Sequence, residues 1–141
     1  MSYTKWFDAH AKKHKEIVDK LVESDYSKEN IIEYFDFDNM VKEEPDFCPL
    51  YKDNKKCHDI DELNCYMCAC PNFRFNDKGL GTYNELKILS DCDIDNGEEF
   101  AGNGVIHQDC SSCSVPHHKS YVSKNFSLNW LEMMKKCKTE V

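Results

Sequence analysis

Cysteine content constrains the fold of this sequence more than any other feature. Eight of the nine cysteines lie between Cys48 and Cys113, in a chain of 141 residues. An odd number of cysteines cannot pair completely within one chain, and a cluster of this kind is typical either of a disulfide framework or of metal binding. They form three groups: Cys48 and Cys57; Cys65, Cys68 and Cys70; and Cys92, Cys110 and Cys113.

The N-terminal segment favours metal over disulfides. The stretch from Met1 to Glu23 carries charges throughout and lacks the continuous apolar run of a secretory signal peptide. No stretch reaches the ~18 apolar residues that cross a bilayer. We therefore expect a cytoplasmic protein whose thiols stay reduced and bind metal.

Two Cys-x2-Cys pairs give the strongest metal signal. Two intervening residues let the sulfurs of Cys65 and Cys68 turn toward one ion, and the same holds for Cys110 and Cys113. Cys70 adds a third thiol beside the first pair. Such a triplet suits zinc, and it also suits an iron–sulfur cluster, in which several thiolates bind neighbouring iron atoms. The sequence therefore predicts a zinc or iron–sulfur centre without choosing between them.

Two histidines extend the candidate ligand set. His58 follows Cys57 directly. His117 lies four residues after Cys113, so it is either a third ligand of that pair or a hydrogen-bond donor to a thiolate. The candidate metal ligands are Cys48, Cys57, His58, Cys65, Cys68, Cys70, Cys92, Cys110, Cys113 and His117.

Three other residues of ligand type are predicted to pack in the interior. His10 and His14 lie four residues apart on one helical face. A pair of packing histidines is commoner there than a metal-binding pair. Cys137 stands apart from the other cysteines, in the terminal segment, and a lone buried thiol usually acts as a small apolar side chain.

Charge limits the classes of partner. The formal net charge is −8, and metal-bound thiolates would make it more negative. Such a surface repels phosphate backbones, and basic residues outnumber acidic ones only from His118 onward. We expect a protein partner of unknown identity, and neither a membrane nor a nucleic-acid partner.

Periodicity predicts helices at both ends of the chain. Apolar residues recur at three- and four-residue steps from Thr4 to Glu23, as in an amphipathic helix. A second helix should begin after Ser27, a candidate N-cap, and end before Pro45. Ser127 is the candidate N-cap of a terminal helix that carries Leu128, Trp130, Leu131 and Met134.

The middle of the chain shows no sustained period. Short strands are expected at Arg74–Phe75 and Gly104–Ile106, and a short helix at Leu80–Leu89. The expected fold is a small α+β or irregular metal-stabilised domain with flanking α-helices. Its parts are a helical N-terminal extension (1–46), a cysteine-rich metal-binding domain (47–122) and a C-terminal helix packed on the same unit (123–141).

The apolar content is low for a chain of this length, with a mean hydropathy of −0.71. An isolated helix is marginal in water, so the first helix must bury its apolar face. The cysteine-rich region offers few large aliphatic residues for this purpose. We therefore expect the two end helices to pack on each other or on one shared face of the metal-binding domain, with Trp6, Phe7 and Ile17 in that contact.

The cysteine pattern has a recognisable order of short motifs. They are Cys48-Pro49-Leu50-Tyr51; Cys57-His58; Asn64-Cys65-Tyr66-Met67-Cys68-Ala69-Cys70-Pro71; Cys92; and Gln108-Asp109-Cys110-Ser111-Ser112-Cys113-Ser114-Val115-Pro116-His117. Over about Phe47 to Val122 this order resembles the cysteine-rich small domain family, which is described as zinc-finger-like and metal-binding. Two features depart from the family: the gap between Cys48 and Cys57 is longer than in many relatives, and Asp93-Ile94 replaces a frequent glycine pair.

The resemblance implies metal binding and does not specify a reaction. In that family the domain also occurs appended to threonine-phosphate decarboxylase-like proteins of cobamide synthesis, where it is associated with an iron–sulfur centre. No decarboxylase sequence is present here, so that context does not carry over.

Two functional hypotheses follow. The first is a non-catalytic structural or interaction module organised by metal, and the alternative is an iron–sulfur-dependent redox or electron-transfer enzyme. A site with four protein ligands is closed, whereas a site with three leaves a position for substrate. Eight clustered cysteines permit two closed sites, which favours the module.

Overall fold

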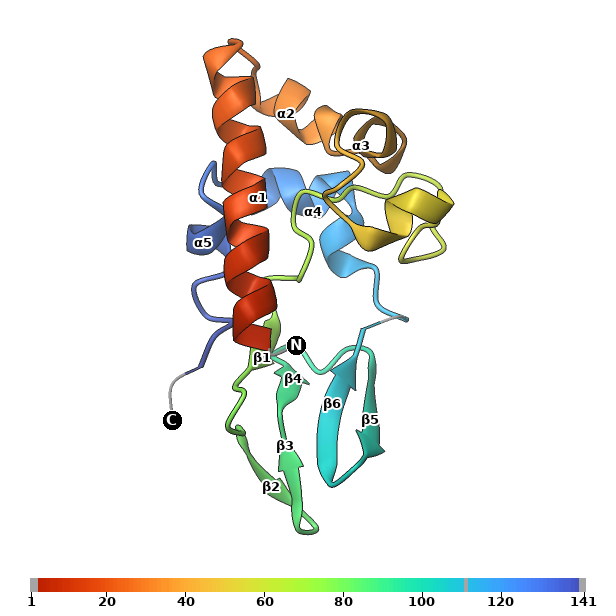
Figure 1. The fold of residues 1–141 in the computed structure, drawn as a ribbon, viewed down its shortest axis with the longest axis vertical. Coiled ribbons are helices and arrows are strands. Elements are labelled where there is room, and N and C mark those ends of the chain that lie inside the picture. Colours follow the sequence, from red (N-terminus) through yellow and green to blue (C-terminus); the bar gives the residue numbers. More distant parts are fainter. Residues whose placement is uncertain (1–2, 111, 140–141) are drawn as a thin grey trace.

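Helices and short strands occupy opposite ends of the molecule in the computed structural model, which describes residues 3–110 and 112–139 (Figure 1). This arrangement confirms the α+β class. In chain order the elements are α1 (Tyr3–Glu23), α2 (Lys28–Tyr34), α3 (Phe37–Glu43), the 3-10 segment η1 (Pro49–Asp53), β1 (Phe73–Phe75), β2 (Gly81–Tyr83), β3 (Leu86–Ile88), β4 (Ser90–Cys92), β5 (Glu98–Gly102), β6 (Val105–Asp109), the 3-10 segment η2 (Val115–His117), α4 (Lys119–Lys124) and α5 (Trp130–Met133).

The predicted amphipathic helix is α1, which begins beside the sheets and runs away from them along the helical end (Figure 1). Its charged residues lie on the opposite side from a continuous buried face. His10 and His14 belong to that face and are packing residues, as expected. Helix α1 ends where Asp25 takes a left-handed φ of 61°. The buried residues are Phe7, His10, Ala11, His14, Ile17, Val18 and Leu21.

The predicted second helix is two helices. Ser27 is the N-cap of α2, as expected, because its hydroxyl accepts a hydrogen bond from the Asn30 amide at 3.1 Å. Asp36 then takes an extended backbone and becomes the N-cap of α3. The break allows Phe35 and Phe37, on either side of it, to be buried together. Helix α3 ends at Glu43, before Pro45, as predicted.

The strands form two small sheets. Strand β1 pairs with β4, and the second sheet has the order β2-β3-β6-β5. The expected strands at Arg74–Phe75 and Gly104–Ile106 are confirmed in β1 and β6. Strands β3 and β6 run parallel, with Lys87 opposite Val105 and Ile88 opposite Ile106.

The expected helix at Leu80–Leu89 is wrong. These residues form the β2–β3 hairpin, in which Tyr83 pairs with Leu86. The two residues between them, Asn84 and Glu85, have left-handed φ values of 49° and 67°, as in the two-residue turns that match strand twist. Leucine and tyrosine recur here at three-residue steps, which is also a spacing of one helical face, so the pattern predicted a helix where a hairpin forms.

The C-terminal segment packs on α1, as expected, although with different details. Asn129, rather than Ser127, caps α5, because its side chain accepts a hydrogen bond from the Leu131 amide. The rings of Phe7 and Trp130 lie 4.8 Å apart. Trp6 does not join this contact: it is 37% exposed and stacks on His10.

Ile17 is buried and lines a groove with Glu43, Glu44, Pro45 and Phe47 on the α3 side. The aliphatic cover expected from the terminal helix is partial. Leu128 and Leu131 are each 49% exposed, whereas Met134 is completely buried.

One hydrophobic core joins the helices to the cysteine-rich region. Tyr66, between Cys65 and Cys68, is fully buried. Its ring lies 4.8 Å from Phe35 and 4.6 Å from His14, and its hydroxyl donates to the Ser127 carbonyl at 2.7 Å. Burying a side chain of this size contributes about 1.5–3 kcal/mol, so the helices help to fix the cysteines.

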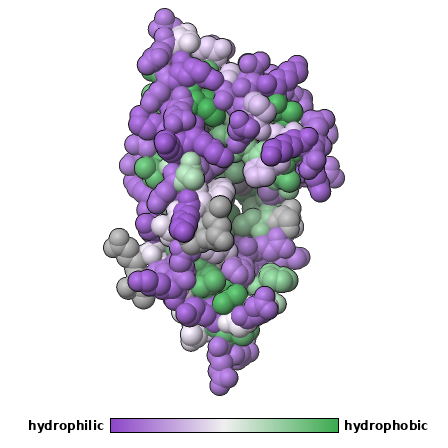
Figure 2. All heavy atoms as spheres, in the orientation of Figure 1, coloured by the Kyte–Doolittle hydropathy of each residue, from purple (hydrophilic) through white to green (hydrophobic). Residues whose placement is uncertain are grey.

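The surface is mainly hydrophilic on the face drawn in Figure 2, with apolar patches that are small and separate. Within the described residues, no helix combines the length and apolar character that crossing a membrane requires.

Candidate metal centre

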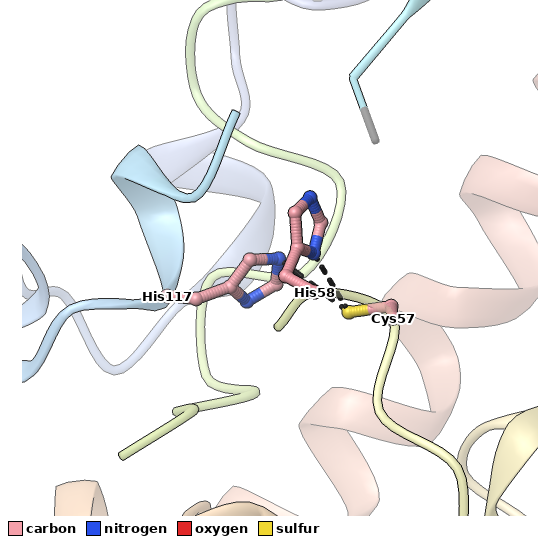
Figure 3. A group of neighbouring side chains, drawn as sticks. All are labelled: Cys57, His58 and His117. Carbon is pink, nitrogen blue, oxygen red and sulfur yellow. Dashed lines mark hydrogen bonds between the residues drawn. The ribbon is translucent and has the colours of Figure 1, made fainter. Parts of the chain in front are cut away.

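Three side chains with metal-binding atoms converge between the helices and the sheets (Figure 3). They are Cys57 and His58, in the loop after η1, and His117, at the end of η2. The three ligand atoms lie within 4.8 Å of one another. His58 Nδ1 is 3.0 Å from Cys57 Sγ, and His117 Nε2 is 3.8 Å from the same sulfur. We call these residues the Cys–His trio.

Backbone carbonyls fix both imidazole rings. The Nε2 atom of His58 lies 2.8 Å from the Cys110 carbonyl oxygen, and the Nδ1 atom of His117 lies 2.9 Å from that of Asn64. A carbonyl can only accept, so each of these nitrogens carries the proton. In an imidazole that carries one ring proton, the other nitrogen presents a lone pair, and in both rings that nitrogen faces Cys57. A backbone bond that orients a ring in this way is typical of metal-binding histidines.

The trio has too few protons to satisfy its own atoms. Two nitrogen lone pairs face one sulfur, and the thiol has a single proton to share between them. Burial lowers the pKa of His117 to about 4, so this ring is neutral near pH 7. A cation held between the sulfur and the two nitrogens would satisfy all three atoms.

Asn64 holds the trio to the helical core. Its backbone amide donates to the His117 carbonyl at 2.9 Å, while its backbone carbonyl accepts from the His117 ring. Its side chain donates to the Ile32 carbonyl at 2.7 Å and to Asp36 at 3.0 Å, and accepts from the Tyr66 amide. Asn64 is fully buried, so each of these bonds is costly to lose.

Cys57 of the trio shares its region of the fold with three other cysteines, Cys48, Cys65 and Cys68. Burial, with negative charge on Cys57 and Cys48, raises the pKa of Cys65 to about 12. Burial also raises the pKa of Cys68, with added effects from the other three. Thiols that influence one another in this way share one region of the fold. We call Cys48, Cys57, Cys65 and Cys68 the first thiol group.

Tyr51 points a buried hydroxyl into the first thiol group. The hydroxyl makes no hydrogen bond of good geometry within the described residues, but it lies close enough to the Cys65 thiol for the two groups to shift each other's pKa. The pKa of Tyr51 is raised by burial, by negative charge on Cys65 and by its side-chain bond with Cys65, and negative charge on Cys48 and Cys68 adds to the rise. The same bond opposes the rise that burial causes in the pKa of Cys65, because a thiolate accepts a hydrogen bond from the hydroxyl better than a thiol does. The donor set therefore fits deprotonated, metal-bound sulfur.

The other four clustered cysteines gather where the strands end. Burial, with negative charge on Cys70, Cys92 and Cys113, raises the pKa of Cys110 to about 11. Asn96 connects two of them: its backbone amide donates to Cys92 Sγ at 3.4 Å, and its side-chain amide to Cys113 Sγ at 3.1 Å. We call Cys70, Cys92, Cys110 and Cys113 the second thiol group.

The structure regroups the residues that the sequence placed together. Cys70 lies with the second thiol group and apart from its sequence neighbours Cys65 and Cys68. His117 faces Cys57, although its spacing suggested the pair Cys110 and Cys113. The predicted triplet and the predicted three-ligand unit are therefore each divided between two places.

Cys137 is a core residue, as expected. Its side chain is completely buried, and its thiol donates to the Cys70 carbonyl at 3.4 Å. It follows α5, in a segment that extends along β1: the Phe75 amide donates to the Cys137 carbonyl at 2.8 Å.

Sequence reasoning did not single out Asn64, Tyr51 and Asn96 as site residues. Asn64 and Tyr51 stand inside the short motifs that carry the family resemblance, so their positions were a usable signal. Asn96 has no such signal, because its role depends on a loop between β4 and β5 that brings it to two sulfurs.

All nine cysteines are free thiols in this small α+β fold. Comparisons with protein-family models, with curated proteins and with solved structures found no match.

Proposed function

We propose that this protein is a non-catalytic metal-binding module in which metal organises the cysteine-rich half of the fold. The observation that carries the proposal is the Cys–His trio, in which two imidazoles anchored by backbone carbonyls present lone pairs to one thiol. The free thiols near the trio and the Tyr51 hydroxyl beside Cys65 support it, because metal binds thiolates and a buried hydroxyl can donate to one. The two nitrogen lone pairs that face one sulfur are unfavourable without a cation and favourable with one.

Mixed sulfur and nitrogen donors support zinc at the trio. Zinc binds thiolate and neutral imidazole readily in four-coordinate structural sites. The trio supplies three donors, and Cys48, Cys65 and Cys68 are neighbours that could supply a fourth. Four protein ligands would close the site, which is the arrangement of a structural centre and not of a catalytic one.

The module would act on a protein partner. The net charge of −8 disfavours contact with nucleic acid, and it becomes more negative when thiolates form. Metal would hold the strands and loops in one arrangement, so the surface offered to a partner would depend on metal.

Metal content tests the proposal. The protein is purified without oxygen, and zinc, iron and sulfide are measured per chain. Zinc without sulfide supports the structural module, whereas iron with equivalent sulfide supports the alternative iron–sulfur protein. Protein that binds neither zinc nor iron under reducing conditions would contradict metal binding altogether.

A pair of neighbouring histidines tests the trio itself. His117→Ala should lower zinc affinity by about tenfold or more, measured by competition with a chromophoric chelator. His118→Ala is the matched control, because His118 is exposed and its ring hydrogen-bonds to the Ser114 hydroxyl. Equal zinc affinity in both variants would remove His117 from the site.

A further inference from the structure

We propose that Cys70, Cys92, Cys110 and Cys113 form a second metal centre, held by four thiolates and no histidine, that is separate from the centre at the Cys–His trio. This inference rests on the proposed function and extends it. It assigns the eight clustered cysteines to two sites that meet between Cys68 and Cys70.

The chain turns sharply at the boundary between the two sites. Ala69 and Cys70 have φ values of 94° and 69°, and both are in the left-handed region that residues other than glycine rarely adopt. Two successive residues of this kind send the Cys70 side chain away from Cys65 and Cys68. Strained backbone of this sort persists where the surrounding structure requires it, and here it delivers one thiol to the other group.

Strand register brings two further thiols together. In the parallel pair β3 and β6, Ile88 lies opposite Ile106, an offset of eighteen positions. The same offset of eighteen continues past this pair, because the backbone amide of Gln108 donates to the Ser90 hydroxyl at 2.7 Å. Carried two residues further, it places Cys92 beside Cys110.

Local turns bring the thiols of Cys70 and Cys113 close to those of Cys92 and Cys110. Phe73 pairs with Cys92 across β1 and β4, and the Phe73 amide donates to the Cys70 carbonyl at 3.1 Å. This turn holds Cys70 next to Cys92. The Cys113 amide donates to the Cys110 carbonyl at 3.0 Å, which closes the Cys-x2-Cys loop.

Hydrogen bonds to sulfur support thiolates at this place. Asn96 donates one bond to Cys92 Sγ and one to Cys113 Sγ. A thiolate accepts such bonds better than a thiol does, and amide donors around metal-bound sulfur set the properties of the centre. Negative charge on Cys113 and Cys92 also raises the pKa of Cys70, after burial, which agrees with close packing of the three.

Four thiolates favour zinc or an iron–sulfur cluster as the metal centre at this place. Zinc with four thiolates would bring the sulfurs to about 3.8 Å from one another, since each Zn–S bond is about 2.3 Å long. Among the described residues these four cysteines do not form a compact set of ligand atoms like the trio's, so zinc would draw their side chains together. An iron–sulfur cluster would instead hold each thiolate on a separate iron atom.

Thiol protection tests the division without changing the sequence. Metal-loaded protein is treated with increasing chelator, alkylated and digested, and mass spectrometry then reports the labelling of each cysteine. We expect two sets with different chelator midpoints: one contains Cys57 and the thiol of Cys48, Cys65 or Cys68 that completes its site, and the other holds Cys70, Cys92, Cys110 and Cys113. Labelling of all eight at one midpoint, or no protection of the second set, would overturn the proposal.

Paired variants give an independent measurement. Cys92→Ser should remove one metal centre per chain and leave the trio's centre, and Cys57→Ser should do the reverse. Cys137→Ser is the matched control and should keep both. If every variant lacks metal, and wild-type protein lacks it too, the proposed function fails together with this inference. If wild-type metal is lost with Cys57→Ser and fully kept with Cys92→Ser, only the second centre fails. Zinc, or iron with sulfide, in the centre that Cys92→Ser removes identifies its occupant.

Discussion

The two thiol groups occupy different kinds of surroundings. The first lies against the helical core, where fully buried Tyr66 and Asn64 fix the Cys65–Cys68 turn and two imidazoles face one thiol. The second lies at the ends of short strands, has no imidazole, and is bridged by the exposed loop residue Asn96. Packing positions the first group, whereas strand register positions the second.

This difference shows how one type of ligand can be held in two ways. Because the Cys65–Cys68 turn is packed into the helical core, a substitution that disturbs this core also displaces the thiols of the turn. A register-built site depends instead on three- and five-residue strands that have little stability of their own. The first group should therefore respond to changes among the helices, and the second to changes around the strands.

Complete metal removal should have the largest effect. The binding free energy of a structural zinc is on the order of 10 kcal/mol and becomes folding free energy when the unfolded chain has no site. We expect chelated, reduced protein to lose its cooperative thermal transition. Hydrogen exchange should show full loss of protection in β1 and β4 and partial protection in α1. An unchanged melting curve after verified metal removal would contradict this expectation.

Acid should act on the first group through the helical core. Burial lowers the pKa of His14 to about 3, and its Nε2 atom contacts the Tyr66 carbonyl at 3.0 Å. The folded state therefore disfavours a proton that the unfolded chain binds at its ordinary pKa of 6.5. The stabilising contribution is complete above pH 6.5 and is lost as the pH falls toward 3.

The comparison with His14→Gln isolates this contribution, because glutamine can still donate to the Tyr66 carbonyl but does not titrate. Between neutral pH and about pH 4.5, wild-type protein should lose about 3 kcal/mol more unfolding free energy than the variant. Urea unfolding at both pH values measures the difference. Parallel pH profiles for the two proteins would exclude a role for His14.

Two asparagines provide a matched test of the two surroundings. Asn64→Ala leaves several buried groups without partners and should cost about 3 kcal/mol of unfolding free energy. Asn96→Ala removes bonds at an exposed position and should cost about 1 kcal/mol or less. In the alkylation assay, Asn64→Ala should expose the first thiol group and Asn96→Ala the second. The reverse pattern would contradict the assignment of these anchors.

Relief of backbone strain should have the smallest effect. Ala69→Gly removes a side chain from a left-handed position and should stabilise the protein by about 1 kcal/mol or less. Ala9→Gly, in the exposed face of α1, is the control and should destabilise it by about 0.5–1 kcal/mol. Chemical denaturation compares the two. A clear loss of stability in Ala69→Gly would show that the turn is not strained.

Local patterns predicted most of the helices and two of the strands. The apolar period of α1, the Ser27 cap and the apolar residues of β1 and β6 act within a few positions of one another. The β2–β3 hairpin was missed because its turn contains Glu85 in a left-handed conformation, for which that residue has little preference.

The candidate ligands were recognisable by type but not by grouping. The sequence could not show that the chain reverses at Ala69, so Cys70 was placed with Cys65 and Cys68. It also could not show that His117 faces Cys57, because this depends on mutual bonds between the His117 and Asn64 segments. Grouping follows from tertiary contacts, which spacing along the chain does not contain.

Native mass spectrometry of protein purified without oxygen tests the central claim most directly. The account predicts a folded chain whose mass exceeds that of the polypeptide by two metal centres, and whose charge-state distribution broadens to that of an unfolded chain when the metal is removed. A compact ion with the mass of the bare polypeptide, together with a cooperative melting transition in the same preparation, would contradict it.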